Sequence, residues 1–165
     1  MPIPERGSSL EDFHMRLMRA FHAQRTYLRP RVDELGLGPG QPKMLVYLAV
    51  HGPSSQREVA DFFECDPGAV SRMFDSLERA GFVTSAPGRD RRTKALELTE
   101  RGRAAADSWD AICADEQEVM LAGFSPEERA AFADLLARAR ANLWRAIDDA
   151  DPARDPAGGA KGGEA

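Results

Sequence analysis

The chain has 165 residues, of which 42% are apolar and 30% are charged, a balance typical of one water-soluble globular domain. Its net charge of -5 excludes a protein that adheres to nucleic acid all over its surface. No apolar run approaches the roughly 18 residues of a membrane span, and Met1–Arg6 lacks the apolar segment of a secretory signal, so we expect a cytoplasmic protein.

Apolar residues at helical spacing predict a first helix from about Ser9 to Tyr27, with a serine as its N-cap. Pro30 is expected to interrupt or kink this helix, and the glycines and proline of residues 36–40 mark a loop. A second helix is predicted over Gln41–His51. Because it is apolar nearly all round, we expect it to be buried between other elements.

Two short helices follow. Ser55 and Glu58 form the pattern of a capping box, which predicts a helix start there. Asp66 is a favourable N-cap and Pro67 a favourable first helical residue, so another helix is predicted from Pro67 to Ala80. Gly81 is expected to end it in a left-handed conformation.

The rest of the chain predicts two strands and two long helices. The strands are expected at Phe82–Ala86 and Thr93–Leu98, around a turn rich in Pro, Gly, Arg and Asp. A long helix follows from Thr99 to about Ala122. A second capping-box pattern at 125–128 starts a final helix that reaches about Ile147. From Asp148 the composition predicts a disordered tail.

The order of these elements predicts the fold class, which is mainly α with a small β-hairpin wing (α+β). A helix, a turn, a second helix and a hairpin together make a winged helix-turn-helix over about residues 41–98. The outer helices, about 9–35 and 99–147, carry apolar stripes that this small module cannot cover alone. We therefore expect one domain over residues 1–147 that forms a twofold homodimer through those helices.

The predicted helix over Pro67–Ala80 has one face free for recognition. Val70, Met73, Phe74 and Leu77 share one side, and polar or small residues occupy the other. A major groove would admit its small N-terminal residues, whereas an ordinary amphipathic surface helix is the alternative. The candidate DNA-contacting residues on it are Gly68, Ala69, Ser71, Arg72, Asp75 and Arg79.

The predicted hairpin tip carries three guanidinium groups. Arginine suits the negative potential of a narrow minor groove, and an acid between arginines can fix one of their rotamers. The tip residues are Arg89, Asp90, Arg91 and Arg92. From Pro67 to Arg103 there are eight Lys/Arg and five Asp/Glu, so this stretch has a net charge of +3 and the rest of the chain one of -8. The local excess of positive charge predicts a phosphate-binding face. The alternative is that it is an accident of surface composition.

Over Leu10–Ile147, and most closely over Asp66–Gly102, the sequence resembles the MarR family of winged helix-turn-helix transcriptional regulators. The segment VSRMFDSLERAGFV resembles that family's recognition helix and its exit into the wing. Asp90 and Arg92 match the wing pattern Asp-x-Arg, and Leu98, Thr99 and Gly102 match the LT-x-x-G start of the dimerising helix. The resemblance implies a homodimeric repressor on a pseudopalindromic operator in double-stranded DNA, released by a small molecule or an oxidant.

The resemblance also implies an effector pocket between the terminal helices and the DNA-binding lobe. An aromatic compound is one option for the effector, since the candidate pocket residues are polar or aromatic. They are His14, Met18, His22, Tyr47, His51 and Trp109. His14 and His22 lie eight residues apart on one helix, but no clustered ligand set accompanies them, so we expect neither a metal nor a cofactor.

Cys65 leaves a redox-responsive regulator open as an alternative. Two cysteines 48 positions apart indicate neither a disulfide framework nor a multi-cysteine metal site. The family's peroxide-sensing branch keeps its reactive cysteine in the N-terminal helix region, a pattern that this sequence lacks. Cys65 does precede a predicted helix N-terminus, a location that can activate a thiol.

Other functional classes fit the residues less well. A nucleophile with its base, paired carboxylates, a metal set and a phosphate loop are all missing from the sequence patterns, so we expect no enzyme. A metal-responsive repressor of the ArsR type would show clustered cysteines. A winged-helix adaptor that contacts protein rather than DNA stays an alternative, although it would have no need for three arginines at one tip.

Overall fold

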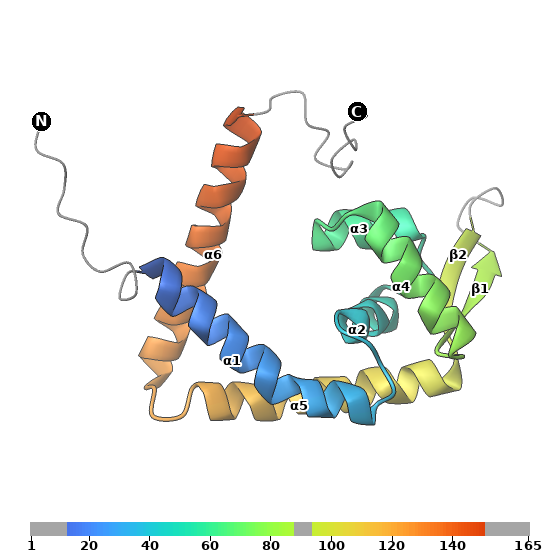
Figure 1. Cartoon of the computed structure of the whole chain (residues 1–165), viewed down its shortest axis with the longest axis horizontal. Coiled ribbons are helices and arrows are strands. Elements are labelled where there is room, and N and C mark those ends of the chain that lie inside the picture. The colour runs from blue at the N-terminus through green and yellow to red at the C-terminus, as the bar shows by residue number, and fades with distance from the viewer. Residues whose placement is uncertain (1–12, 88–93, 151–165) are drawn as a thin grey trace, which may run out of the picture. The chain divides into compact units, whose positions relative to one another are not determined.

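The computed structural model describes residues 13–87 and 94–150 (Figure 1). By its internal contacts the chain divides into two compact units, Met1–Pro39 and Gly40–Ala165. The division falls in the loop that the glycines and proline of residues 36–40 predict. Each unit is described separately below.

Helix α1 (Phe13–Glu34) is the described helix of the first unit. It continues through Pro30, so the prediction of a helix that ends near Tyr27 is wrong. A proline removes one backbone hydrogen bond, here the bond to the Thr26 carbonyl oxygen, and at the neighbouring position the Arg31 guanidinium donates to the Tyr27 carbonyl oxygen at 3.0 Å. The same guanidinium lies 4.2 Å from the centroid of the Tyr27 ring, which further supports the turn that contains the proline.

The second unit begins with the predicted winged helix-turn-helix. Its three helices are α2 (Gln41–His51), α3 (Gln56–Phe63) and α4 (Pro67–Arg79). Its two strands are β1 (Val83–Pro87) and β2 (Lys94–Leu98), which pair antiparallel with Val83 opposite Leu98. The fold class predicted from the element order is confirmed.

Sequence-local chemistry explains where these helices start and stop. The Glu58 carboxylate accepts from Ser55 N at 2.7 Å while Glu58 N donates to Ser55 Oγ at 3.2 Å, which is the reciprocal capping box. Gly81, just beyond α4, has a φ of 76°, the left-handed conformation predicted for it.

Helix α2 packs between other elements, as its sequence predicts, but its last residues are exposed. Met44, Leu45 and Leu48 are buried in the core. Val50 is 72% exposed. Within the second unit, α2 packs mainly against α5, with further contacts to β2 and α4.

The hairpin is tied to the helices by a third extended segment. Ser54, between α2 and α3, exchanges two backbone hydrogen bonds with Leu96 of β2, at 3.1 and 2.9 Å. Leu96 and Val83 bury their side chains in the core. The strands at the start of the wing are therefore held against the helices by backbone hydrogen bonds and buried side chains.

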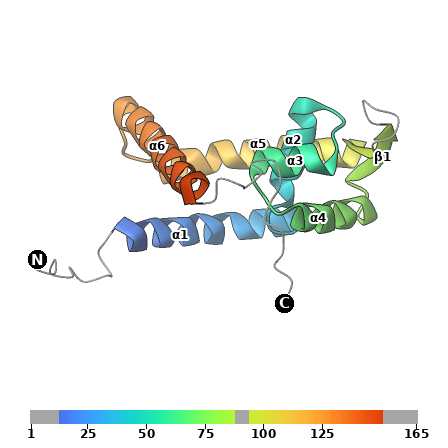
Figure 2. The same cartoon turned by 90° about the horizontal axis from the view of Figure 1, so that it is seen from above.

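Two long helices complete the second unit, α5 (Glu100–Met120) and α6 (Pro126–Ala150). Figures 1 and 2 show α2, α3, α4 and the hairpin gathered at one end of α5, while α6 leads away from the other end. At that corner Arg129 of α6 donates to the Glu118 carboxylate at 2.8 and 3.1 Å. None of the helices in the described ranges 13–87 and 94–150 is both long and apolar enough to cross a membrane.

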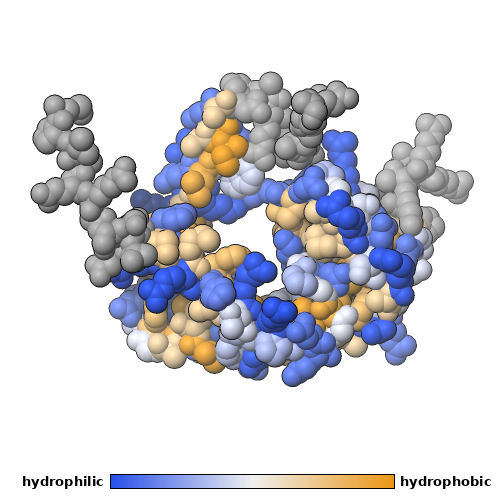
Figure 3. Space-filling model, in the orientation of Figure 1, coloured by the Kyte–Doolittle hydropathy of each residue, from blue (hydrophilic) through white to orange (hydrophobic). Residues whose placement is uncertain are grey.

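Helix α6 extends three residues beyond the predicted end at Ile147, so Asp148, Asp149 and Ala150 are helical rather than part of a tail. Asp148, Asp149 and Ala150 include no proline or glycine that would interrupt the helix. Figure 3 shows apolar side chains along α6. They remain exposed within the single chain, Phe132 at 39%, Leu135 at 55% and Leu143 at 66%.

Candidate nucleic-acid interface

The first turn of α4 is fixed by Asp66 and Pro67. The Asp66 carboxylate accepts a hydrogen bond from the Ala69 backbone N–H at 2.7 Å, which confirms Asp66 as the N-cap. Gly68 and Ala69 follow in the same turn, and Gly68 is exposed. After Pro67, the first turn of the helix therefore carries only small side chains of its own.

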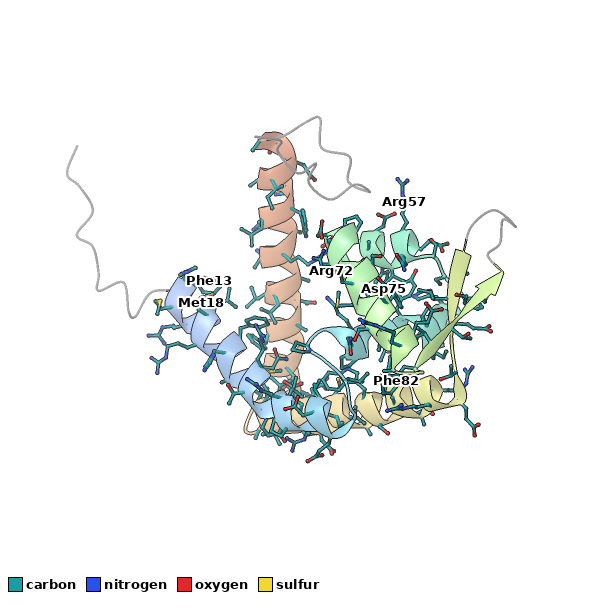
Figure 4. The ribbon with its side chains drawn as sticks, turned by 45° about the vertical axis from the view of Figure 1, so that its right-hand side comes forward. Phe13, Met18, Arg57, Arg72, Asp75 and Phe82 are labelled. Atoms are coloured by element: carbon teal, nitrogen blue, oxygen red, sulfur yellow. The ribbon has the colours of Figure 1, made fainter. Side chains whose placement is uncertain are left out.

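The two faces of α4 differ as its sequence predicts. Val70, Phe74 and Leu77 are at most 1% exposed and anchor the helix in the core. Arg72 and Asp75 point away from that core and are exposed (Figure 4). The free face thus carries a cation and an acid, side by side, on a rigid helix.

Arg72 lies over the small residues at the start of α4. Its guanidinium Nη1 is 3.5 Å from the position that a Cβ on Gly68 would occupy. The nearest atom to that position is Asp66 Oδ2 at 3.1 Å, so a larger residue at position 68 would crowd the capping carboxylate, whereas its contact with Arg72 would be an ordinary one. Ser71, the neighbouring predicted contact, is half-buried.

The last turn of α4 is linked to the first strand. Arg79, which is exposed, donates from Nε to the Asp75 carbonyl oxygen at 3.2 Å. The Ser85 hydroxyl of β1 donates to the Glu78 carboxylate at 2.8 Å. These contacts fix the direction in which β1 leaves the helix.

The four tip residues predicted to enter the minor groove, Arg89, Asp90, Arg91 and Arg92, lie outside the described residues. The strands on either side of them are described, and Leu96 and Leu98 on β2 are buried. The tip residues therefore stay a prediction from the sequence.

Arg57 is a cation of the helix-turn-helix that the sequence reasoning missed. It lies in the first turn of α3, with its side chain 72% exposed, and its nearest acid is Asp61 at 3.8 Å (Figure 4). The signal was available, because Arg57 stands inside the capping-box segment Ser55–Glu58 and hence at the open end of a helix. An exposed cation there can approach a phosphate.

The end of α4 and the start of α5 form one tightly packed joint. The Thr99 hydroxyl donates to the Gly81 carbonyl oxygen at 2.7 Å and accepts from the Gly102 backbone N–H at 3.1 Å. Arg101 donates to the Ala80 carbonyl oxygen at 2.7 Å, with its guanidinium 4.2 Å from the centroid of the Phe82 ring. The start of α5 is therefore joined to the segment that ends α4 by direct hydrogen bonds and a ring contact.

The predicted effector-pocket residues are divided between the two units. His14, Met18 and His22 are exposed on α1, and Figure 4 labels Met18 there. In the second unit the rings of Tyr47 and His51 lie 4.3 Å apart. The structure adds two aromatic neighbours that the prediction did not include, because Phe62 and Phe63 lie 4.9 and 5.9 Å from the Tyr47 ring. Trp109 lies on α5 and is half-buried.

The two cysteines have different surroundings. Burial raises the pKa of the Cys113 thiol, and the carboxylates of Glu116 and Asp110 raise it further, so this thiol resists ionisation. Cys65 is half-buried, and Lys43 Nζ lies 3.6 Å from its sulfur. No group of three or more His, Cys, Asp or Glu side chains placed to hold a metal occurs in the part of the chain that the structure describes.

Glu64 connects the turn of the helix-turn-helix to α6. It ends α3 with a φ of 53°, an uncommon value for a residue other than glycine. Arg140 of α6 donates to its carboxylate. The turn that precedes α4 is thus in direct contact with the last helix.

Comparison with known proteins places this geometry among transcriptional regulators. A model of the MarR family matches residues 37–94. The HTH-type transcriptional regulator YwoH of Bacillus subtilis is 28% identical over 105 residues, which are 64% of this chain and 77% of that protein.

Solved structures share the fold over most of the chain. The crystal structure of the transcriptional regulator PA3341 aligns with a TM-score of 0.69 at 31% identity and covers 81% of this chain and 99% of its own. The Staphylococcus aureus MepR-DNA complex aligns with a TM-score of 0.75 at 17% identity and covers 82% of this chain and 99% of its own.

Proposed function

This chain belongs to the MarR family of winged helix-turn-helix transcriptional regulators, and from that premise we propose that it is a homodimeric repressor. The dimer binds a pseudopalindromic operator in double-stranded DNA. A small-molecule effector releases it.

The observation that carries the proposal is the contrast between the two faces of α4. One face is anchored by three side chains that are almost completely buried, and the other presents Arg72 and Asp75 to solvent beside the small residues Gly68 and Ala69. A helix that is held so firmly and has a narrow, open N-terminal end is suited to a major groove. MepR, which has the same fold, was crystallised with DNA, and that complex supports the same role for this chain.

A second copy of the chain is the proposed partner of α6. The helix is 25 residues long, and no residue of it is buried within the single chain. Its exposed apolar side chains lie on one stripe: Phe132, Leu135, Leu136, Leu143 and Ile147. A stripe of this length is rarely left in water, and a twofold dimer covers two identical stripes with one another.

Effector release is proposed to act through a shift between two conformers. DNA binds the conformer in which the spacing of the two α4 helices matches one turn of the duplex, and the effector binds the other. The joint of Thr99, Gly102 and Phe82 supports this mechanism, because it couples α5 to the end of α4. In the second unit, the rings of Tyr47 and His51 offer a surface on which a flat aromatic effector could stack.

Redox control through Cys65 is the second candidate. It is favoured by the contact between the Cys65 sulfur and Lys43 Nζ, which places a polar side chain beside a half-buried thiol. In this version the protein is the same DNA-binding dimer, and an oxidant replaces the small molecule as the signal.

Fluorescence anisotropy with labelled duplexes tests the proposed function. The duplex from the protein's own promoter is expected to bind about a thousandfold more tightly than a scrambled duplex of equal length at physiological salt. Sedimentation of the protein alone is expected to give twice the 18.1 kDa mass of one chain. A monomer that does not distinguish the two duplexes, even in dilute salt, would contradict the proposal.

A further inference from the structure

Two nucleophilic side chains meet at the turn before α4, and the proposed DNA contacts use neither of them. Lys43, in the first turn of α2, places its Nζ 3.6 Å from the sulfur of Cys65. The Cys65 thiol also donates to the Phe63 carbonyl oxygen at 3.3 Å, and Lys43 Nζ lies 4.7 Å from the centroid of the Phe63 ring. Both side chains are half-buried, so the pair is held in place yet open to a small reagent.

The pair lies where a covalent change would reach the recognition helix. Cys65 directly precedes Asp66, whose carboxylate caps the first turn of α4. Lys43 belongs to α2, whose apolar face is fixed in the core. A bond between the two side chains would therefore join the start of α4 to a rigid element.

We propose that Cys65 and Lys43 form a modification site that a hydroperoxide converts into a covalent sulfur–nitrogen cross-link. In the first step the thiol sulfur attacks the peroxide, the O–O bond breaks, and Cys65 becomes a sulfenic acid while the peroxide leaves as an alcohol or water. The sulfur has then lost two electrons and the peroxide has gained them.

The second step needs no further oxidant. The Lys43 ammonium releases one proton to solvent, and the free amine attacks the sulfenic sulfur. The S–N bond forms as the S–O bond breaks, and the oxygen leaves as water after taking up the proton of the amine. Condensation of a sulfenic acid with a nitrogen is an established route of thiol oxidation. Lys43 thus acts as the second nucleophile, the role that a second cysteine has when a disulfide forms.

Cys113 does not compete for this chemistry. Its thiol has a raised pKa and two carboxylates nearby, so it supplies little of the thiolate that reacts with peroxide. The charged neighbour of Cys65 is instead a cation.

The cross-link changes the geometry at the turn. A bond from sulfur to nitrogen is shorter than the about 2 Å of a disulfide bond, so the present separation of 3.6 Å must close by more than about 1.5 Å. The Lys43 side chain and the turn are the parts that can move to close it, and in the turn Glu64 has a left-handed backbone and is bound by Arg140. The chemistry depends on the pair alone, whereas its effect on operator binding rests on the proposed function.

The experiment uses the full chain with Cys113→Ser, which removes the second thiol. The protein is treated with hydrogen peroxide, and its intact mass and its peptides are measured with and without a thiol reductant. We expect a loss of about 2 Da, which corresponds to two hydrogens, a cross-linked peptide pair that contains Lys43 and Cys65, and full reversal by the reductant. Lys43→Arg keeps the positive charge but lacks the amine, so the same treatment is expected to add oxygen to Cys65 instead.

Two outcomes would overturn the proposal. One is oxygen addition at Cys65 without the cross-linked peptides although Lys43 is present, and the other is a Cys65 that stays reduced while peroxide oxidises the methionines. Operator binding by the reduced protein is measured in parallel. If the cross-link forms but the reduced protein ignores its promoter, the DNA-binding proposal fails and the modification site stands; if the reduced protein binds and no cross-link forms, only the modification site fails.

Discussion

Gly102 of α5 lies against the backbone of Phe82, so close that a Cβ on the glycine would be 1.9 Å from the Phe82 carbonyl oxygen. Only a residue without a side chain permits this contact. The same carbonyl accepts hydrogen bonds from Thr99, through its backbone N–H and its hydroxyl, both at 3.1 Å. The first turn of α5 is thereby packed onto the segment that leaves α4.

Gly102→Ala is expected to destabilise the protein by about 2–3 kcal/mol, because the new methyl group forces the first turn of α5 away from Phe82. Urea unfolding followed by circular dichroism measures the change. Arg103→Ala is the matched control, since Arg103 is exposed on the next position of the same helix and should change stability by less than about 0.5 kcal/mol. Equal stabilities for the two variants would show that the joint tolerates a side chain.

Thr99→Val tests the hydroxyl at the same joint. Valine keeps the shape of threonine but can neither accept from Gly102 N nor donate to the Gly81 carbonyl oxygen, so a loss of about 1–2 kcal/mol is expected. Thr99→Ser retains the hydroxyl and should recover most of that loss. If serine and valine are equally destabilising, the methyl group rather than the cap holds the joint.

The parts of the fold that the sequence predicted are those that depend on neighbouring residues. Asp66 and Pro67 start α4 because a short acid can accept from the third backbone N–H beyond it and a proline needs no partner there. Ser55 and Glu58 start α3 for an equally local reason. The free face of α4 followed in turn, since helical spacing alone separates Arg72 from Phe74.

The parts that were missed depend on contacts between distant residues. Pro30 predicted a break in α1, but the side chain of Arg31 supplies a donor to the turn that the proline weakens. The composition of α2 does not predict the exposure of Val50. Whether Val50 is buried depends on which other elements pack against that side of the helix. The hydrogen bond from Arg140 to Glu64 joins residues 76 positions apart, and no local sequence pattern predicts it.

Arg72→Ala is expected to weaken operator binding about tenfold, because it removes a cation from the end of α4 that faces DNA in the proposed complex. If Arg72 contacts a phosphate, the slope of log affinity against log salt also falls by about one. Anisotropy at several salt concentrations measures both. Arg29→Ala is the control, since the Arg29 side chain is 82% exposed on α1 and should affect neither quantity. Identical binding by the two variants would remove Arg72 from the interface.

The wing arginines lead to a related prediction from the sequence. Arg92→Ala, or Arg91→Ala if the tip is rotated, should weaken binding tenfold or more and lower the salt slope by about one. The same titration measures the effect, with Arg29→Ala again as the reference. An unchanged slope in both wing variants would contradict a role for the hairpin tip in DNA binding.

The dimer is tested by two lysines placed on opposite sides of α6. Leu136 belongs to the apolar stripe, and Ala141 lies on the opposite side of the helix at 100° per residue. In the proposed dimer, Leu136→Lys buries a charge against the partner's stripe, a cost of several kcal/mol that should produce monomers in sedimentation at micromolar concentration. Ala141→Lys adds the same charge in water and should leave the dimer intact.

The same two variants should also differ in operator binding, because one copy of α4 contacts only half of a pseudopalindromic site. Leu136→Lys is expected to lose at least a hundredfold in affinity for the full operator while it keeps its helical circular dichroism, and Ala141→Lys is expected to bind as the parent does. Should Leu136→Lys remain a dimer, α6 would not be the contact between the two copies. Should it become a monomer with unchanged affinity, a single recognition helix would be sufficient for operator binding, and the proposal that binding requires a twofold dimer would be wrong.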